Sequence, residues 1–107
     1  YDLAPLLQAP FINSDLRLDD ARARRLSPAG MTPATAAPLI TAVGAVESAE
    51  FRRQTDLMAR AWSSVTLRSL PLPGANHLTI MDELANTASP LFDAALELVR
   101  ATRRPVH

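Results

Sequence analysis

The chain contains no cysteine and no lysine, so all eleven of its basic residues are arginines. The absence of cysteine excludes disulfide bonds, thiolate nucleophiles and cysteine-based zinc sites. The eleven acidic residues balance the arginines, and the formal net charge is zero. Without a basic excess, the sequence lacks the electrostatic footprint of proteins that bind nucleic acid or anionic membranes. We therefore expect neither kind of partner.

Long hydrophobic segments are also missing. No apolar run approaches the roughly 18 residues of a membrane span, and the first residues lack the basic-then-apolar pattern of a signal peptide. The composition, 48% hydrophobic and 21% charged over 107 residues, is typical of one small globular domain. We expect a soluble, cytoplasmic protein. Because the chain begins at Tyr1 without an initiator methionine, we also expect it to be part of a longer protein.

The N-terminal third predicts one helix between two irregular segments. Residues 1–13 contain two prolines among apolar residues, a pattern typical of an irregular connection. Either Asn13 or Ser14 could cap a helix that ends near Leu26, with arginines in its last turn where the helix dipole favours them. Residues 27–38, rich in proline and small residues, predict a loop.

Two short segments predict β-strands. Residues 39–43 are mostly apolar and lie between a proline and a glycine, which is typical of a buried strand in a parallel sheet. Residues 65–70 include three polar residues, so we place this second strand nearer the edge of the sheet. We expect Pro71, Pro73 and Gly74 to end it.

A helix is predicted between the two strands, over residues 49–62. Ser48 is a suitable N-cap. Phe51, Met58 and Trp62 recur at helical spacing, with charged residues on the opposite face. This apolar stripe predicts packing against the core.

Two more helices are predicted towards the C-terminus. A short one lies at about 79–84, and a longer one begins at Ser89-Pro90 and leads to a frayed tail that ends at His107. The order strand, helix, strand, helix is the signature of an α/β fold, in which parallel strands need helical crossovers. Two strands cannot complete such a sheet, so we expect additional chain to pair with them.

Candidate catalytic residues follow both predicted strands. Glu47 lies in the loop after the first strand and His77 in the loop after the second. The carboxyl ends of parallel strands lie at one edge of a sheet, where ligands bind. A carboxylate there can orient an imidazole, whose second nitrogen then takes a proton from a nucleophile.

A nucleophile is not evident. A G-x-S-x-G turn between a strand and a helix is one way to expose a nucleophilic serine at the top of an α/β sheet. None of the serines of the chain has that context. They are Ser14, Ser27, Ser48, Ser63, Ser64, Ser69 and Ser89. We therefore expect the nucleophile upstream of Tyr1.

Three segments carry a resemblance to a known family. They are residues 1–6 (YDLAPL), 43–55 (VGAVESAEFRRQT) and 73–80 (PGANHLTI). In order and spacing they resemble the last part of the arylformamidase-like (kynurenine formamidase-like) esterases of the α/β-hydrolase superfamily. The resemblance implies that residues 1–107 are the C-terminal part of one α/β-hydrolase domain, with a helical excursion and loop over 9–37 and the last two strands and helices over 38–107.

The resemblance also implies roles for individual residues. His77 corresponds to the general base and Glu47 to the acid that orients it. The family usually has aspartate at the position of Glu47, which is one methylene shorter. Glu50, inside the following helix, is therefore kept as an alternative acid.

The function implied is a serine-type hydrolase that cleaves small acyl esters or N-formyl amides through an acyl-enzyme, without a metal or organic cofactor. Its partners would be the small-molecule substrate and the N-terminal portion of the same hydrolase, with a homodimer as a further assembly. The alternative is a non-catalytic α/β-hydrolase-like module that serves binding or assembly. The replacement of aspartate by Glu47 gives that alternative its support.

Overall fold

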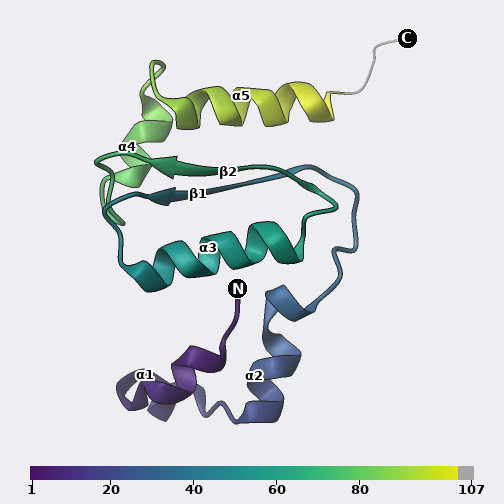
Figure 1. The fold of residues 1–107 in the computed structure, drawn as a ribbon, viewed down its shortest axis with the longest axis vertical. Coiled ribbons are helices and arrows are strands. Elements are labelled where there is room, and N and C mark those ends of the chain that lie inside the picture. The colour runs from purple at the N-terminus through teal and green to yellow at the C-terminus, as the bar shows by residue number, and fades with distance from the viewer. Residues whose placement is uncertain (104–107) are drawn as a thin grey trace.

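A computed structural model describes residues 1–103. Within these residues the fold is mixed α/β, with five α-helices and one sheet of two parallel strands. Strands β1 (Leu39–Gly44) and β2 (Thr66–Leu72) lie between helix α3 (Ala49–Ala61) on one face and helix α5 (Pro90–Thr102) on the other (Figure 1). These layers follow the sequence pattern, because a helix must cross over between two parallel strands.

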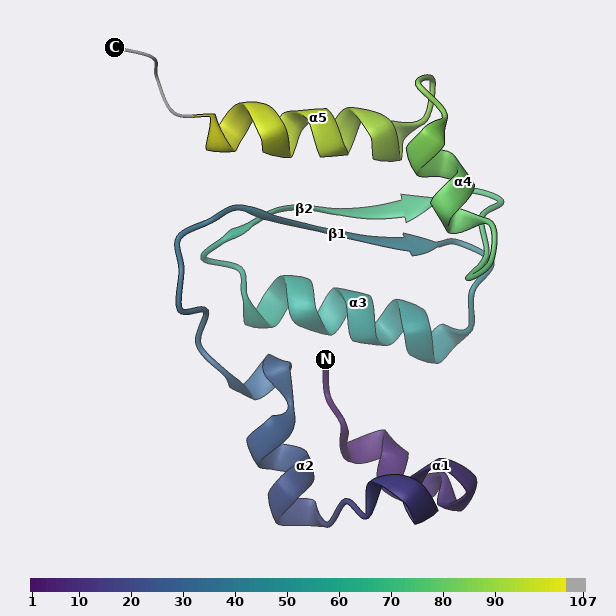
Figure 2. The ribbon, with the colours of Figure 1, turned by 180° about the vertical axis from the view of Figure 1, so that it is seen from behind.

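The short helix α4 (Ile80–Ala85) lies at the carboxyl end of the two strands, as the view from behind also shows (Figure 2). The core between the layers is small. Its buried apolar side chains include Val43, Met58 and Leu72.

The two strands pair in parallel, with Ala42 opposite Leu70 and Gly44 opposite Leu72. The predicted parallel neighbours are therefore confirmed. The sequence had predicted that the second strand would stop before Pro71. This prediction is wrong, because the strand continues to Leu72. Proline is tolerated at an edge strand because its missing N–H can face away from the partner strand.

Helices α3 and α5 confirm the predicted start signals. The Ser48 hydroxyl accepts a hydrogen bond from Phe51 N–H, and the Ser89 hydroxyl accepts one from Leu91 N–H. Pro90 stands in the first turn of α5, where its missing donor is not needed. The tail at His107 lies outside the described residues.

The N-terminal third differs from its prediction. Residues 1–13 were expected to be irregular, but they contain a short 3-10 helix (Ala4–Gln8) and most of α1 (Pro10–Leu16). The single predicted helix is divided, and its second part is α2 (Asp20–Leu26), which Asp19 caps.

The physical reason for the division is a C-terminal cap on α1. Arg17 adopts the left-handed conformation, with a φ angle of 52°. The Asn13 side chain donates to Leu18 O at 3.1 Å and accepts from Leu18 N at 2.8 Å. Asn13 therefore does not cap the start of the longer helix as expected, but stabilises the turn after α1.

The N-terminal segment packs beneath α3, on the side away from the sheet (Figure 1). The amide of Gln54 on α3 both accepts from Asp2 N at 2.7 Å and donates to Asp2 O at 2.8 Å. The Trp62 indole N–H, at the end of α3, is shared between Pro28 O and Met31 O at 3.0 Å each. None of the helices within residues 1–103 combines the length and hydrophobicity that a membrane crossing requires.

Candidate active site

The turn after β1 holds the side chain of Glu47 in place. Glu47 N–H donates to Gly44 O at 3.0 Å, which closes a four-residue turn. The same glutamate then folds back, and its Oε2 accepts the Gly44 N–H at 2.5 Å. The Glu47 side chain is only 5% exposed. One carboxylate oxygen is thus bound to the backbone, and the other is left for a second partner.

The loop after β2 presents His77 from a turn organised by Asn76. Asn76 Oδ1 accepts the N–H groups of Leu78 at 2.8 Å and Thr79 at 2.9 Å. A further hydrogen bond closes the turn, because the Thr79 hydroxyl accepts the Asn76 N–H at 2.9 Å. Gly74, which has a φ angle of 74°, allows the chain to turn before this loop. The histidine backbone is therefore fixed by bonds on both sides.

The two loops are joined to each other by backbone hydrogen bonds. Ala45 N–H donates to Leu72 O at 2.9 Å, and Val46 N–H donates to Ala75 O at 3.2 Å. Gly44 makes this approach possible, because a Cβ atom there would lie 2.2 Å from Ala75 O. Only glycine fits where two backbones come this close.

The structure brings together Glu47 and His77, the two residues predicted from the sequence. His77 Nδ1 lies 3.1 Å from Glu47 Oε1. With the carboxylate ionised, Nδ1 carries the proton that is shared with Glu47, so Nε2 is left as a base. This nitrogen belongs to a side chain that is 70% exposed, and it is therefore accessible to a reacting group.

A cavity of about 250 Å³ adjoins this pair. Its apolar lining comes from Ala42 and Val43 of β1, Phe51 of α3 and Ile80 of α4, together with Tyr1. The ring of Phe51 stacks on the His77 imidazole, with 5.2 Å between the centroids and 20° between the planes. The predicted interior role of Phe51 is wrong, because this side chain is 49% exposed while Met58 on the same helix is buried.

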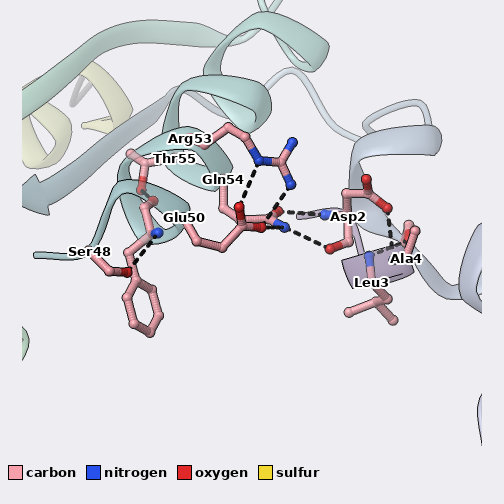
Figure 3. Close-up of polar contacts among 10 residues, drawn as sticks. Asp2, Leu3, Ala4, Ser48, Glu50, Arg53, Gln54 and Thr55 are labelled. Atoms are coloured by element: carbon pink, nitrogen blue, oxygen red, sulfur yellow. Dashed lines mark hydrogen bonds and ion pairs between the residues drawn. The ribbon is translucent and has the colours of Figure 1, made fainter. Parts of the chain in front are cut away.

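Glu50, the alternative acid, points to a different set of partners. Its two oxygens accept from Arg53 Nε and Nη2 at 2.8 Å each, and Oε1 also accepts from Gln54 Nε2 at 3.0 Å (Figure 3). The hydrogen bonds from Arg53 and then Gln54 lower the pKa of Glu50 from 4.5 to about 2. Glu50 is thus engaged with its own helix and with the residue that binds Asp2.

Within residues 1–103, Glu47 is the only residue whose side chain forms a hydrogen bond with His77. Four serines have structural partners instead: Ser27 donates to Ala23 O, Ser48 caps α3, Ser69 pairs with Thr41, and Ser89 donates to Glu83. No group of three or more potential metal-binding side chains occurs in the part of the chain that the structure describes. What the described residues assemble is an acid and a base beside an apolar cavity.

Comparison with protein-family models, curated proteins and solved structures found no match to this chain. The chemistry of the site therefore rests on its geometry.

Proposed function

We propose that this chain supplies the acid and base of a serine-type hydrolase of α/β-hydrolase type that cleaves small acyl esters or N-formyl amides. The single observation that carries the proposal is the contact between His77 and a buried Glu47 at the carboxyl ends of two adjacent parallel strands. This is the edge of an α/β sheet at which ligands bind. The same arrangement of acid and base serves nucleophilic catalysis in several unrelated folds.

In the proposed reaction, His77 Nε2 takes the proton of a serine hydroxyl as its oxygen attacks the substrate carbonyl. The imidazolium returns that proton to the departing alcohol or amine, and an acyl-enzyme remains. Water then attacks the acyl group by the same route, and His77 again accepts and returns one proton. Glu47 stays ionised throughout and stabilises the imidazolium. The scheme needs no metal or organic cofactor.

The serine and the oxyanion-binding N–H groups are proposed to come from chain outside these 107 residues. Apolar side chains near the site support this part of the proposal, because Val46, Leu78 and Met81 are 61%, 84% and 64% exposed. Covering such a surface is favourable by about 25 cal/mol for each Å² removed from water. A further part of the same protein that covers it would also close the site.

The geometry also supports a glutamate at the position where arylformamidase-like esterases usually have aspartate. The extra methylene lets the Glu47 carboxylate fold back so that Gly44 N–H binds Oε2 while His77 binds Oε1. A carboxylate held at both oxygens keeps a fixed orientation. The replacement is therefore compatible with the orienting role, which weakens the main support for a non-catalytic module.

The test compares two glutamates three residues apart. In the full-length protein we expect a fluorophosphonate probe to label the serine, and His77→Ala to slow both labelling and ester hydrolysis about 10²–10⁴-fold. Glu47→Gln should cause a loss in the same range. Its single amide oxygen would accept the Gly44 N–H, so its N–H₂ group would face His77 Nδ1 and favour the wrong tautomer. Glu50→Gln, the matched control, should remain within about twofold of wild type, since within residues 1–103 the Glu50 carboxylate forms hydrogen bonds only with Arg53 and Gln54.

Three outcomes would contradict the proposal. Wild-type protein that neither labels nor hydrolyses esters or N-formyl amides would favour the binding or assembly module. Labelling unaffected by His77→Ala would remove the general base. An equal loss in the two glutamine variants would assign Glu47 no special part in orienting His77.

A further inference from the structure

Phe51 lies at the site although its position in the helix suggested the core. It stands in the first turn of α3, where its N–H donates to Ser48 Oγ at 3.3 Å. The helix meets the interior mainly through Thr55 and Met58, which are 4% and 8% exposed. Phe51 is 49% exposed, so burial alone does not account for its placement. Its specific contact is the stack on the His77 ring.

The stack restrains a motion that Glu47 leaves free. One hydrogen bond, from Nδ1 to Glu47 Oε1, fixes a single point on the imidazole ring. The ring can still pivot about that contact, and a 70% exposed side chain has few other neighbours to prevent it. A pivot changes the direction of Nε2, which lies on the far side of the ring. An aromatic face 5.2 Å away and only 20° from parallel resists the pivot.

We propose that Phe51 is a positioning residue, which holds the plane of the His77 imidazole while Glu47 holds its Nδ1 atom. The role in catalysis rests on the proposed hydrolase function, whereas the restraint on the ring does not. Together the two contacts determine where Nε2 points. A displacement of about 1 Å in a catalytic group can reduce the rate about 100-fold, so this restraint has a measurable consequence.

The first experiment observes the stack directly. In full-length protein with isotope-labelled histidine, the ring protons of His77, assigned with a His77→Gln variant, should resonate upfield because they lie over the Phe51 ring. Phe51→Leu keeps an apolar side chain but removes the ring current, so these signals should move downfield. Phe51→Tyr should preserve their positions. Phe11→Leu is the matched control, because Phe11 is 79% exposed on α1 and should leave the signals unchanged.

The second experiment measures ester hydrolysis by the same variants. Phe51→Leu should lower kcat about 10-fold to 100-fold with KM within about twofold, because the loss affects the alignment of the base rather than substrate binding. Phe51→Tyr, which keeps an aromatic ring at this position, should retain the kcat of the wild-type protein. A purely structural role would lower thermal stability without this split between kcat and KM.

The outcomes separate this inference from the proposed function. Unchanged His77 signals in Phe51→Leu would overturn the restraint. Shifted signals with unchanged kcat, in an enzyme that needs His77, would overturn the positioning role. If the wild-type protein has no hydrolase activity, the proposed function and the catalytic role both fail, and the spectra still decide whether Phe51 holds the ring.

Discussion

The loops at the carboxyl ends of the strands and the N-terminal segment are attached to the fold in different ways. The loops, residues 44–48 and 73–79, are joined by backbone hydrogen bonds such as Ala45 N–H to Leu72 O. The N-terminal segment, residues 1–31, depends mainly on side chains: those of Gln54 and Trp62 supply four hydrogen bonds that attach it to α3, and that of Ser27 supplies one within the segment.

This difference predicts where each region is sensitive to mutation. Backbone hydrogen bonds survive most substitutions, so the loops should tolerate changes except where a side chain would push two backbones apart. In the N-terminal segment, by contrast, substitution of any one side chain that binds the backbone removes a hydrogen bond that holds the segment in place. The geometry of the Glu47 and His77 pair should therefore depend more on Gly44, where the two loops approach each other, than on the polar side chains around the pair.

The largest effect is expected from Gly44→Ala. The new Cβ would lie 2.2 Å from Ala75 O and 2.6 Å from Ala75 C, so the two loops must separate. Overpacking of this kind costs about 1–3 kcal/mol of unfolding free energy and occasionally more. Because Glu47 Oε2 binds the Gly44 N–H, the same change should disturb the acid. Denaturant unfolding and the His77 ring signals together measure both effects.

The matched control for this change is Gly30→Ala. The nearest heavy atom to its added Cβ is Arg24 O at 3.8 Å, an ordinary contact distance. Its effect on the unfolding free energy should stay within about 1 kcal/mol, with no change at His77. Equal destabilisation by the two substitutions would contradict the close approach of the loops.

A smaller and more local effect is expected from Ser27→Ala. The buried Ser27 hydroxyl donates to Ala23 O and accepts Leu3 N–H at 2.8 Å, so its removal leaves the Leu3 donor without its partner. We expect a loss of about 1 kcal/mol in unfolding free energy, because the Leu3 N–H is only part-buried. Hydrogen exchange should accelerate in residues 1–31 but not in the two strands. Equal acceleration in the strands would show that the two regions are not attached independently.

The parts of the fold that the sequence predicted correctly are those governed by local signals. The strand at 39–43 and the caps at Ser48 and Ser89 each depend on a few neighbouring residues, and the structure confirms them. The division between α1 and α2 could not be predicted in this way. It depends on the left-handed conformation of Arg17, which few residues other than glycine adopt. It also depends on the Asn13 side chain, which binds Leu18 after α1 instead of capping the start of a helix.

For the site, the sequence predicted the contact of Glu47 with His77, because parallel strands bring the loops at their carboxyl ends together. It did not decide between Glu47 and Glu50, although the spacing of Glu50 from Arg53 and Gln54 was a signal that its carboxylate would bind within the helix. The role of Phe51 was missed for another reason. Helical periodicity identifies a face of the helix, but not where that face passes beyond the core to a neighbouring loop.

The smallest effect is expected from acid, and it should again distinguish the two regions. Hydrogen bonds from Arg53 and Gln54 lower the pKa of Glu50 to about 2, below the ordinary value of 4.5. The ionised form is thus favoured by folding, so its contribution is complete above about pH 4.5 and is lost as the pH falls towards about 2. The Glu50 side chain is 50% exposed, so salt should weaken the contribution further.

Protonation of Glu50 removes an acceptor of Gln54, the residue whose amide also holds Asp2. The N-terminal segment should therefore loosen as the pH falls towards about 2, whereas the backbone hydrogen bonds that join the two loops do not involve this carboxylate. Subtracting the pH dependence of Glu50→Gln from that of wild type isolates the contribution of this carboxylate, and a titration of its side-chain carbon by NMR should give the lowered pKa. If the difference between the two proteins is the same at pH 2 and at pH 6, Glu50 does not bind Arg53 and Gln54 in solution as it does in the structure. In that case Glu50 would again be a candidate for the acid that orients His77.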